Sequence, residues 1–266
     1  MKLALAQIAI EGGDVAENVR HATEAIESAA ERGADLVALP EIFNVGYFAF
    51  ETYQRNAEPL HGPTLTRISD LADEHDIGVL AGSIVEDLSE TTDETPAEEG
   101  LANTSVFFDR DGNRAAVYRK HHLFGYESAE AEMLVPGESL GIAEFEDVTV
   151  GMTTCYDLRF PELYRSIAEA GATLVLVPSA WPYPRVDHWR ILTQARAIEN
   201  QCFVAAINGS GSYEDATLLG RSSVYDPWGT LLAGTGDEPE IVIRDIDPER
   251  VTRVREEFPA WHDRRR

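Results

Sequence analysis

The sequence predicts an α/β fold in which two sheets pack face to face between outer helices, a four-layer αββα sandwich. Two observations carry this prediction. Strand-like apolar segments alternate with amphipathic helical segments along most of the chain. Residues 30–40 also match residues 168–178 position by position across a helix end, a glycine and a strand. Helix–glycine–strand order can arise by convergence, but both copies end at a proline that stops an apolar strand. This favours an internally repeated plan with pseudo-twofold symmetry.

The strands of the first half are short apolar runs bounded by turn-forming residues; they are expected at residues 3–10, 35–40, 77–83, 103–109 and 115–120. The first helix opens with a capping box of Asp14 and Glu17 and ends at Gly33. A second helix starts near Pro63, a favoured first helical position. Residues 86–100 hold seven acids and no apolar period, so we expect a solvated loop there.

The second half repeats the alternation, with strands expected at residues 148–154, 173–178, 202–208 and 240–245, and helices at residues 161–171 and 186–200. A hairpin is expected around residues 226–229, and the tail holds a short helix ending at Trp261. No linker-like stretch divides the chain. We therefore expect one domain over residues 1–266, with a core of about residues 1–245 and a tail at 246–266.

The charge is strongly negative: 47 acidic residues stand against 22 basic ones, a net charge of −25. Such a surface repels nucleic acid and anionic membranes. The acids are spread along the chain, which resembles the proteins of extreme halophiles and predicts a salt-rich cytoplasm. No apolar run approaches the ~20 residues of a membrane span. Two cysteines are too few for a disulfide scaffold, so a reducing cytoplasm is expected.

Cys155 lies where a predicted buried strand stops abruptly before a helix that begins at Pro161. This places it at the carboxyl edge of a sheet, where α/β proteins carry their chemistry. A cysteine there is either a small apolar filler or a nucleophile.

Two further candidates occupy similar positions. The 22 basic residues include only two lysines, Lys2 and Lys120, and Lys120 ends a predicted strand. A compact ammonium can occupy a site that a wide guanidinium cannot. Glu41 follows the strand that ends at Pro40. A carboxylate that takes a proton, an ammonium that stabilises an oxyanion and a sulfur that attacks are what thiol-dependent amide hydrolysis requires.

These residues stand in segments that resemble the nitrilase, or carbon–nitrogen hydrolase, superfamily. The resemblance runs from the first strand to about Gly229, and its segments are Leu39–Glu41, Tyr118–Phe124, Pro136–Gly137, Cys155–Glu162, Ser179–Pro182 and Ala195–Asn200. It implies the αββα sandwich, assembly as a homodimer across a helical layer, and hydrolysis of non-peptide C–N bonds. It implies no metal and no cofactor.

Carried over by position, the resemblance implies that Glu41 is the general base, Lys120 the oxyanion-stabilising ammonium and Cys155 the nucleophile. The backbone N–H of Tyr156 would be the second oxyanion donor.

The family has a fourth polar residue, a glutamate between the lysine and the cysteine. Spacing to the Pro-Gly pair selects Glu130, whereas counting forward from the lysine selects Glu127. We favour Glu130.

The substrate-binding residues are open to two interpretations. Arg159 could bind a substrate carboxylate or form an ion pair with Glu162. Trp181 could wall the pocket or fill the core. The segments around the cysteine most resemble the amidase branch that contains omega-amidases and deaminated-glutathione amidase, so we expect a small carboxamide substrate.

Several alternatives stay open. An N-carbamoyl hydrolase would often show two adjacent arginines where Leu158 and Arg159 stand, and a nitrilase or an inactive binding protein could share the fold. His121, His122 and His188 could indicate a Cys–His protease or a metal site, but no HExxH or CxxC spacing supports a metal. Adjacent histidines on a strand face opposite sides, so at most one could join Cys155.

Overall fold

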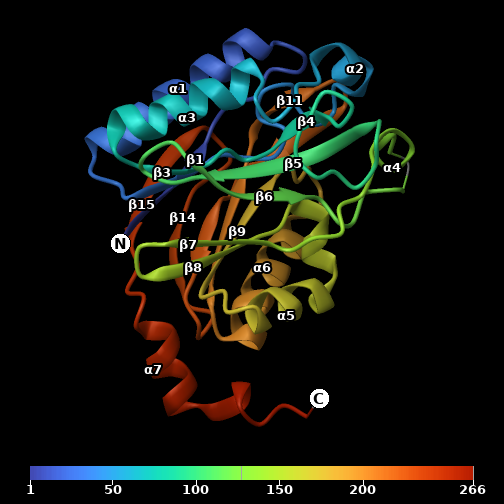
Figure 1. The fold of residues 1–266 in the computed structure, drawn as a ribbon. Coiled ribbons are helices and arrows are strands. Elements are labelled where there is room, and N and C mark those ends of the chain that lie inside the picture. Colours follow the sequence, from blue (N-terminus) through green and yellow to red (C-terminus); the bar gives the residue numbers. More distant parts are fainter. Residues whose placement is uncertain (127, 266) are drawn as a thin grey trace.

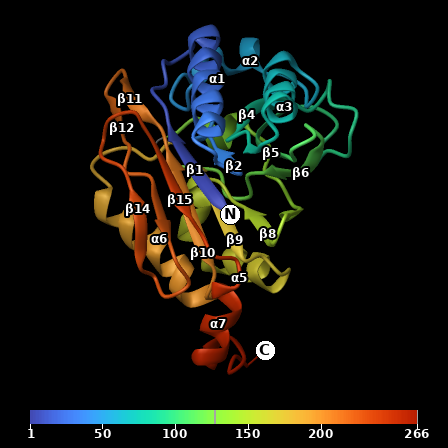
Figure 2. The same ribbon diagram turned by 90° about the vertical axis from the view of Figure 1, so that its left-hand side faces the viewer.

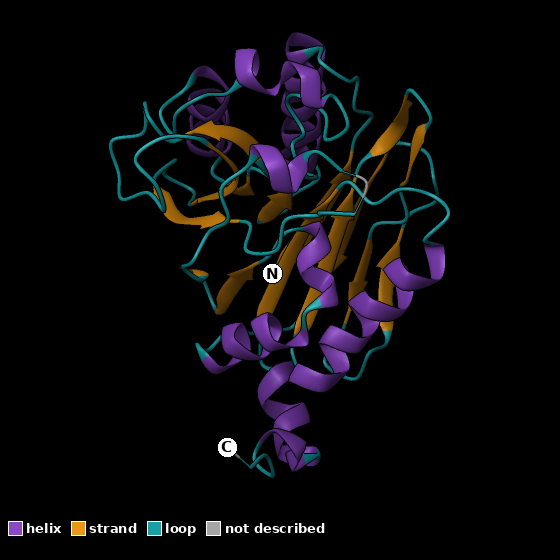
Figure 3. Cartoon of the chain, turned by 90° about the vertical axis from the view of Figure 1, so that its right-hand side faces the viewer, coloured by secondary structure: helices purple, strands orange, loops and turns teal. Residues whose placement is uncertain are grey.

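The structure, a computed structural model, describes residues 1–126 and 128–265. Four layers are visible in it (Figures 1 and 3): α1 (Val15–Glu31) and α3 (Pro63–His75) cover the first sheet, and α5 (Pro161–Glu169) and α6 (Val186–Asn200) cover the second. The predicted αββα sandwich is confirmed.

The first sheet has the strand order β15-β1-β2-β3-β5-β4, and β6 pairs with the opposite edge of β5. Its strands are β1 (Lys2–Gln7), β2 (Leu36–Ala38), β3 (Gly78–Leu80), β4 (Ile84–Asp87), β5 (Leu101–Phe108), β6 (Arg114–Arg119) and β15 (Glu240–Asp245).

The second sheet has the order β14-β13-β10-β9-β8-β7. Its strands are β7 (Gly141–Phe145), β8 (Val148–Met152), β9 (Leu174–Ser179), β10 (Phe203–Asn208), β13 (Ser223–Tyr225) and β14 (Leu231–Gly234). The remaining elements are the hairpin β11 (Ser210–Tyr213) and β12 (Ala216–Leu219), the short helices α2 (Tyr53–Asn56) and α4 (Glu130–Met133), α7 (Arg250–Glu257) and three 3₁₀ turns, Phe50–Thr52, Cys155–Arg159 and Pro259–Trp261.

The internal repeat is visible in the topology. In the first sheet β1, β2 and β3 are parallel neighbours joined through α1 and α3. In the second, β8, β9 and β10 are parallel neighbours joined through α5 and α6. The matching sequences at residues 30–40 and 168–178 fall on the α1–β2 and α5–β9 junctions. The repeat therefore places the ends of β2 and β9 at equivalent points.

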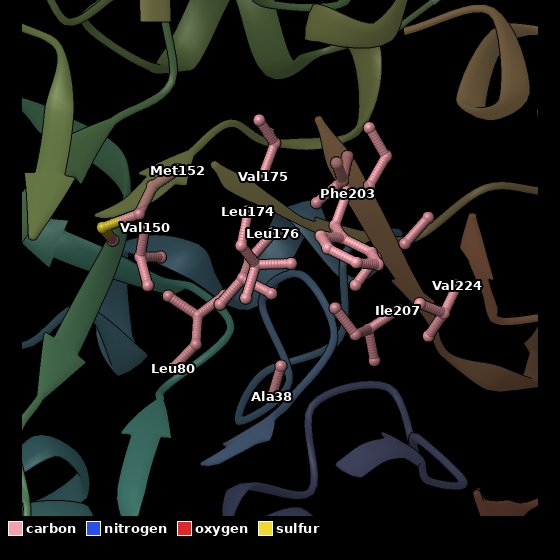
Figure 4. Close-up of a cluster of buried hydrophobic side chains, with 14 of the residues drawn as sticks. Ala38, Leu80, Val150, Met152, Leu174, Val175, Leu176, Phe203, Ile207 and Val224 are labelled. Atoms are coloured by element: carbon pink, nitrogen blue, oxygen red, sulfur yellow. The ribbon is translucent and has the colours of Figure 1, made fainter. Parts of the chain in front are cut away.

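The core between the sheets is apolar and closely packed (Figure 4). Ala38 and Leu80 of the first sheet belong to one buried cluster with Leu174, Leu176 and Ile207 of the second. Val175 points away from Leu174 and Leu176, as the two-residue period of a strand requires. Burial of these side chains removes apolar area from water and fixes the sheets against each other.

Some local predictions need correction. Asp14 caps α1 by accepting from Glu17 N at 3.1 Å, but the Glu17 carboxylate turns to Arg20 at 2.5 Å, so the capping box is only half formed. The acidic segment 86–100 begins inside β4, and Glu86 is buried because Arg119 pairs with it at 2.7 Å. An ion pair on the sheet overrides the polar composition of the segment. The predicted strand 148–154 ends two residues early, at Met152.

The tail contacts the body of the protein through a few residues. Figures 1 and 2 show α7 extending away from the sheets, yet Val251 and Val254 are buried and Arg250 pairs with Asp226 at 2.8 Å. Among the described residues, no helix has the length and apolar character needed to span a membrane.

Candidate active site

Cys155 opens a 3₁₀ turn immediately after β8, with a backbone φ of +44°. Such a φ is strained for a residue with a Cβ. Asp157, fully buried, holds the turn: it accepts from Thr154 N at 2.9 Å, from the Tyr118 hydroxyl at 2.6 Å and from His122 N at 3.0 Å. These bonds connect the turn to the end of β6 and fix the cysteine at the sheet edge.

Lys120, directly after β6, lies beside two carboxylates. Its Nζ is 2.8 Å from Glu41 Oε1 and lies 2.8 and 3.0 Å from the two carboxylate oxygens of Glu130. Burial acts against its charge, but Glu130 and Glu41 outweigh this effect and hold the pKa of Lys120 well above its usual value. The side chain is therefore an ammonium, although it is only 1% exposed.

Glu41 is held at both oxygens. Its Oε2 accepts from Ala180 N, which follows β9, at 2.8 Å, and its Oε1 accepts from Lys120 and from Asn103 Nδ2 at 2.9 Å. The contact with Ala180 joins the equivalent ends of β2 and β9. Burial raises the pKa of Glu41, and Lys120 opposes the rise only in part.

The Cys155 thiol is neutral at rest. Burial is the main cause that raises the pKa of Cys155 well above its usual value, and the nearby Glu41 carboxylate adds to it. Lys120 has the opposite, smaller effect. The thiol therefore loses its proton only when a base accepts it.

Glu130 lies in the one-turn helix α4 and is fully buried. Besides Lys120, its carboxylate accepts from Asn103 Nδ2 at 3.1 Å, Tyr47 hydroxyl at 3.1 Å and Phe124 N at 2.7 Å. The structure thus brings Glu130 to the expected place, while Glu127 lies outside the described residues.

A pocket of about 440 Å³ opens over Cys155 and Lys120. Aromatic side chains form much of its wall; they include Tyr47, Phe48, Phe50, Phe124, Tyr156 and Trp181. Trp181 has both of the roles considered for it. It lines the pocket, and it is also 3% exposed and belongs to the buried core cluster. The N–H of Tyr156 belongs to the first turn of the 3₁₀ segment, where N–H groups have no intrahelical partner.

Arg159 also lines the pocket. Its guanidinium lies 5.2 Å from the centre of the Trp181 ring and donates to His188 Nδ1 at 3.2 Å. In the described part of the chain the alternative ion pair with Glu162 is not formed. Arg185, which the sequence interpretation did not select, lines the same pocket with its guanidinium 5.7 Å from the Phe124 ring centre.

The histidines have other partners. His121 and His122 lie beyond the end of β6, so the predicted alternation on a strand does not apply. His122 Nδ1 is 2.7 Å from Asp157 Oδ1, and His121 Nε2 is 3.1 Å from the Ser139 carbonyl. Within the described residues, no three His, Cys, Asp or Glu side chains are arranged to hold a metal ion.

Sequence reasoning missed Asn103 and Tyr47. A signal for Asn103 was present: Asn103, Thr104 and Ser105 interrupt an otherwise apolar strand, and all three are fully buried. Consecutive buried polar residues need hydrogen-bond partners. Tyr47 lies in an irregular segment and gave no comparable signal.

The comparisons with known proteins show the family. The carbon-nitrogen hydrolase family model matches residues 2–256. The 2-oxoglutaramate amidase of Bacillus subtilis is 35% identical over 260 residues, covering 98% of this chain and 96% of that protein. The human omega-amidase NIT2 is 34% identical over 274 residues, covering 99% and 95%.

A solved structure of the amidase from Nesterenkonia sp. AN1, in which acrylamide has added to the active-site cysteine, superimposes with a TM-score of 0.82. It is 29% identical, covering 97% of this chain and 98% of that one. With a match over nearly its whole length, this chain belongs to the carbon–nitrogen hydrolase family.

Proposed function

We propose that this carbon–nitrogen hydrolase is a thiol amidase that cleaves a small linear carboxamide to a carboxylate and ammonia. The observation that carries the proposal is that Lys120, which binds both Glu41 and Glu130, lines the same pocket as Cys155. A base, a fixed positive charge and a thiol are together the requirements for acyl transfer through a thioester.

In the first half-reaction, Sγ of Cys155 adds to the amide carbon while Glu41 accepts the thiol proton. The carbonyl electron pair moves to oxygen, where the Lys120 ammonium and the Tyr156 N–H stabilise it. The intermediate then collapses: the C–N bond breaks, Glu41 returns its proton to the leaving nitrogen, and ammonia departs from the thioester.

In the second half-reaction, Glu41 accepts a proton from water as the water oxygen adds to the thioester carbon. The C–S bond breaks, the carboxylic acid is released and the proton returns to sulfur. Glu130 touches Lys120 and is proposed to hold its ammonium in place during both halves.

For the substrate class, we propose the amide of a 2-oxo acid, with Arg159 binding the distal carboxylate. Arg159 and Arg185 line the pocket, and neither forms a salt bridge with a described acidic residue. A carboxylate would gain a charge-assisted hydrogen bond from either guanidinium. The names of the amidases in Bacillus subtilis and human point in the same direction.

The test is ammonia release in multimolar KCl from 2-oxo acid amides, simple aliphatic amides, carbamoyl amino acids and nitriles, with Cys155→Ala as the control. We expect release from the 2-oxo acid amides, absent in the variant. Release only from carbamoyl compounds or nitriles would move the protein to another branch of the family. Well-folded protein without release from any class would favour a binding protein.

We also propose a homodimer formed across the helical layer, in the reducing cytoplasm. Exposed apolar side chains gather on α6 and the elements beside it: Ile191, Ile198, Trp228, Leu231 and Phe258. Covering such a patch removes apolar area from water. Sedimentation velocity should give a dimer, and Ile191→Glu combined with Ile198→Glu should give a monomer. A wild-type monomer would refute the proposed dimer.

The proposed location in a reducing cytoplasm is supported by the two cysteines, Cys155 and Cys202, which are both unpaired.

A further inference from the structure

We propose that Asn103 is a positioning residue that holds the carboxylates of Glu41 and Glu130 around one ammonium, so that Glu41 stays available as the base. The inference rests on the proposed amidase function, and it assigns a role to a residue that does not line the pocket.

Asn103 contacts three of the polar site residues at once. Its Nδ2 donates to Glu41 Oε1 at 2.9 Å and to Glu130 Oε1 at 3.1 Å. Its backbone carbonyl accepts from Lys120 N at 2.9 Å. One residue of β5 therefore fixes the start of the lysine segment and both carboxylates.

The hydrogen bonds close into a ring. Lys120 Nζ and Asn103 Nδ2 each donate to the same two oxygens, Glu41 Oε1 and Glu130 Oε1. Two carboxylates in a buried site repel each other, and a single ammonium compensates only one of the two charges. The amide places a second donor between the two oxygens without adding charge. Asn103 thus reduces the repulsion between the two side chains that share one lysine.

A purely structural role explains the arrangement less well. Asn103 is fully buried, yet its Oδ1 has no hydrogen-bond partner among the described residues. A buried acceptor without a partner costs folding free energy. An apolar side chain of similar size would avoid the cost of the unpaired Oδ1 atom. The NH₂ group makes both of its hydrogen bonds, and the two acceptors are the site carboxylates of Glu41 and Glu130.

The consequence concerns proton uptake by Glu41. The groups facing its carboxylate are Lys120, Glu130, the Cys155 thiol and Ala180 N, with the Tyr47 hydroxyl behind Glu130. Burial already raises the pKa of Glu41. Loss of the Asn103 donor should raise it further, because the repulsion from Glu130 is then less compensated. Glu41 would be protonated, and inactive as a base, over a wider pH range.

The experiment compares wild type with Asn103→Leu and Asn103→Ala, which both remove the donor without adding charge; the first nearly keeps the side-chain volume. We expect kcat at neutral pH to fall at least about tenfold, within the range of general-base effects, with KM changed by less than about twofold. The acid limb of kcat/KM should move to higher pH. A matched control is Asn18→Leu: Asn18 is equally buried, but its amide binds the carbonyls of Glu11 and Asn44 in another part of the fold.

A purely structural role would lower the melting temperature of the Asn103 and Asn18 variants alike and leave the acid limb in place, which would overturn the proposal. If Asn103→Leu does not fold, Asn103→Ala decides. The pH dependence of Cys155 alkylation by iodoacetamide gives a readout without substrate. Wild type that is alkylated but releases no ammonia would refute the amidase function alone. A variant with an unshifted alkylation profile would refute the role of Asn103.

Discussion

At the scale of single residues, the chain's scarcity of lysine has a local explanation at Lys120. The Nζ atom lies within 3.0 Å of two carboxylates, and the lysine is almost completely buried. A guanidinium is wider, planar and spreads its charge over three nitrogens. It cannot approach the same oxygens and also leave one N–H for the substrate oxygen without displacing Glu41 or Glu130.

Lys120→Arg should therefore lose activity although it keeps the charge. We expect kcat to fall by at least about 10²-fold, the usual effect of losing one oxyanion donor. The chain offers its own control, since Lys2 is the other lysine and is exposed; Lys2→Arg should keep wild-type rates. Near-native turnover by Lys120→Arg would remove the proposed oxyanion role.

The pH profile should report on Glu41. Its pKa is raised from the ordinary 4.5, chiefly by burial, with Lys120 opposing. The base works only when ionised, so kcat/KM should fall as the pH drops through this raised pKa, at a pH above 4.5. Initial rates across the acidic range, with circular dichroism to verify folding, measure it. A limb at or below the ordinary value in folded protein would contradict the assignment.

At the scale of elements, the repeated helix–strand units and the edge strand β15 were predictable, whereas the edge strands β4 and β7 were not. The apolar runs before Pro40 and Pro178 predict two strands, and the structure confirms both as the parallel strands β2 and β9. The prolines do not stop them: β2 already ends at Ala38, and β9 continues through Pro178 to Ser179. The edge strands β4 and β7 and the separate hairpin of β11 and β12 have mixed composition and were missed. Their pairing depends on neighbouring strands rather than on their own sequence.

The same division holds for the site. Glu41, Lys120 and Cys155 each follow a strand whose end the sequence indicates, so their convergence could be expected. Glu130 sits on a single helical turn in an irregular segment, and its position depends on bonds to Lys120, Asn103 and Phe124 N. No local pattern encodes such long-range contacts. Spacing alone therefore left two candidates.

The C-terminal tail raises the question of whether α7 contributes to the stability of the core. We predict that residues 246–266 form an appendage, yet Val251 and Val254 of α7 are buried. Val251→Ala with Val254→Ala should lower the free energy of unfolding by about 3 kcal/mol, at ~0.8 kcal/mol per buried CH₂ removed. Urea unfolding at fixed salt and protein concentration measures it, with exposed Arg253→Ala as the control. A loss no larger than that of the control would show that α7 is energetically separate from the core.

At the scale of the whole molecule, the net charge of −25 dominates. Few of these acids belong to the site: among the residues that the structure describes, the acids of the pocket wall are Glu214 and Asp215. The segment that follows β4 alone carries the exposed residues Glu90, Glu94, Glu98 and Glu99. Repulsion among such charges favours expansion of the chain, and dissolved salt screens it. The net charge therefore affects how the stability of the fold depends on salt, whereas the chemistry depends on a few buried groups.

We accordingly expect the melting temperature to rise between about 0.1 M and about 2 M KCl. A gain of about 2 kcal/mol corresponds to about 4–8 °C for a domain of this size. Changing the same four glutamates to glutamine lowers the net negative charge by four and should reduce the salt dependence, which separates charge screening from a general effect of salt on apolar burial. Calorimetry of both proteins in KCl makes the comparison. A melting temperature that is highest in dilute buffer, or a variant with an unchanged salt response, would mean that the acidic surface is not an adaptation to salt.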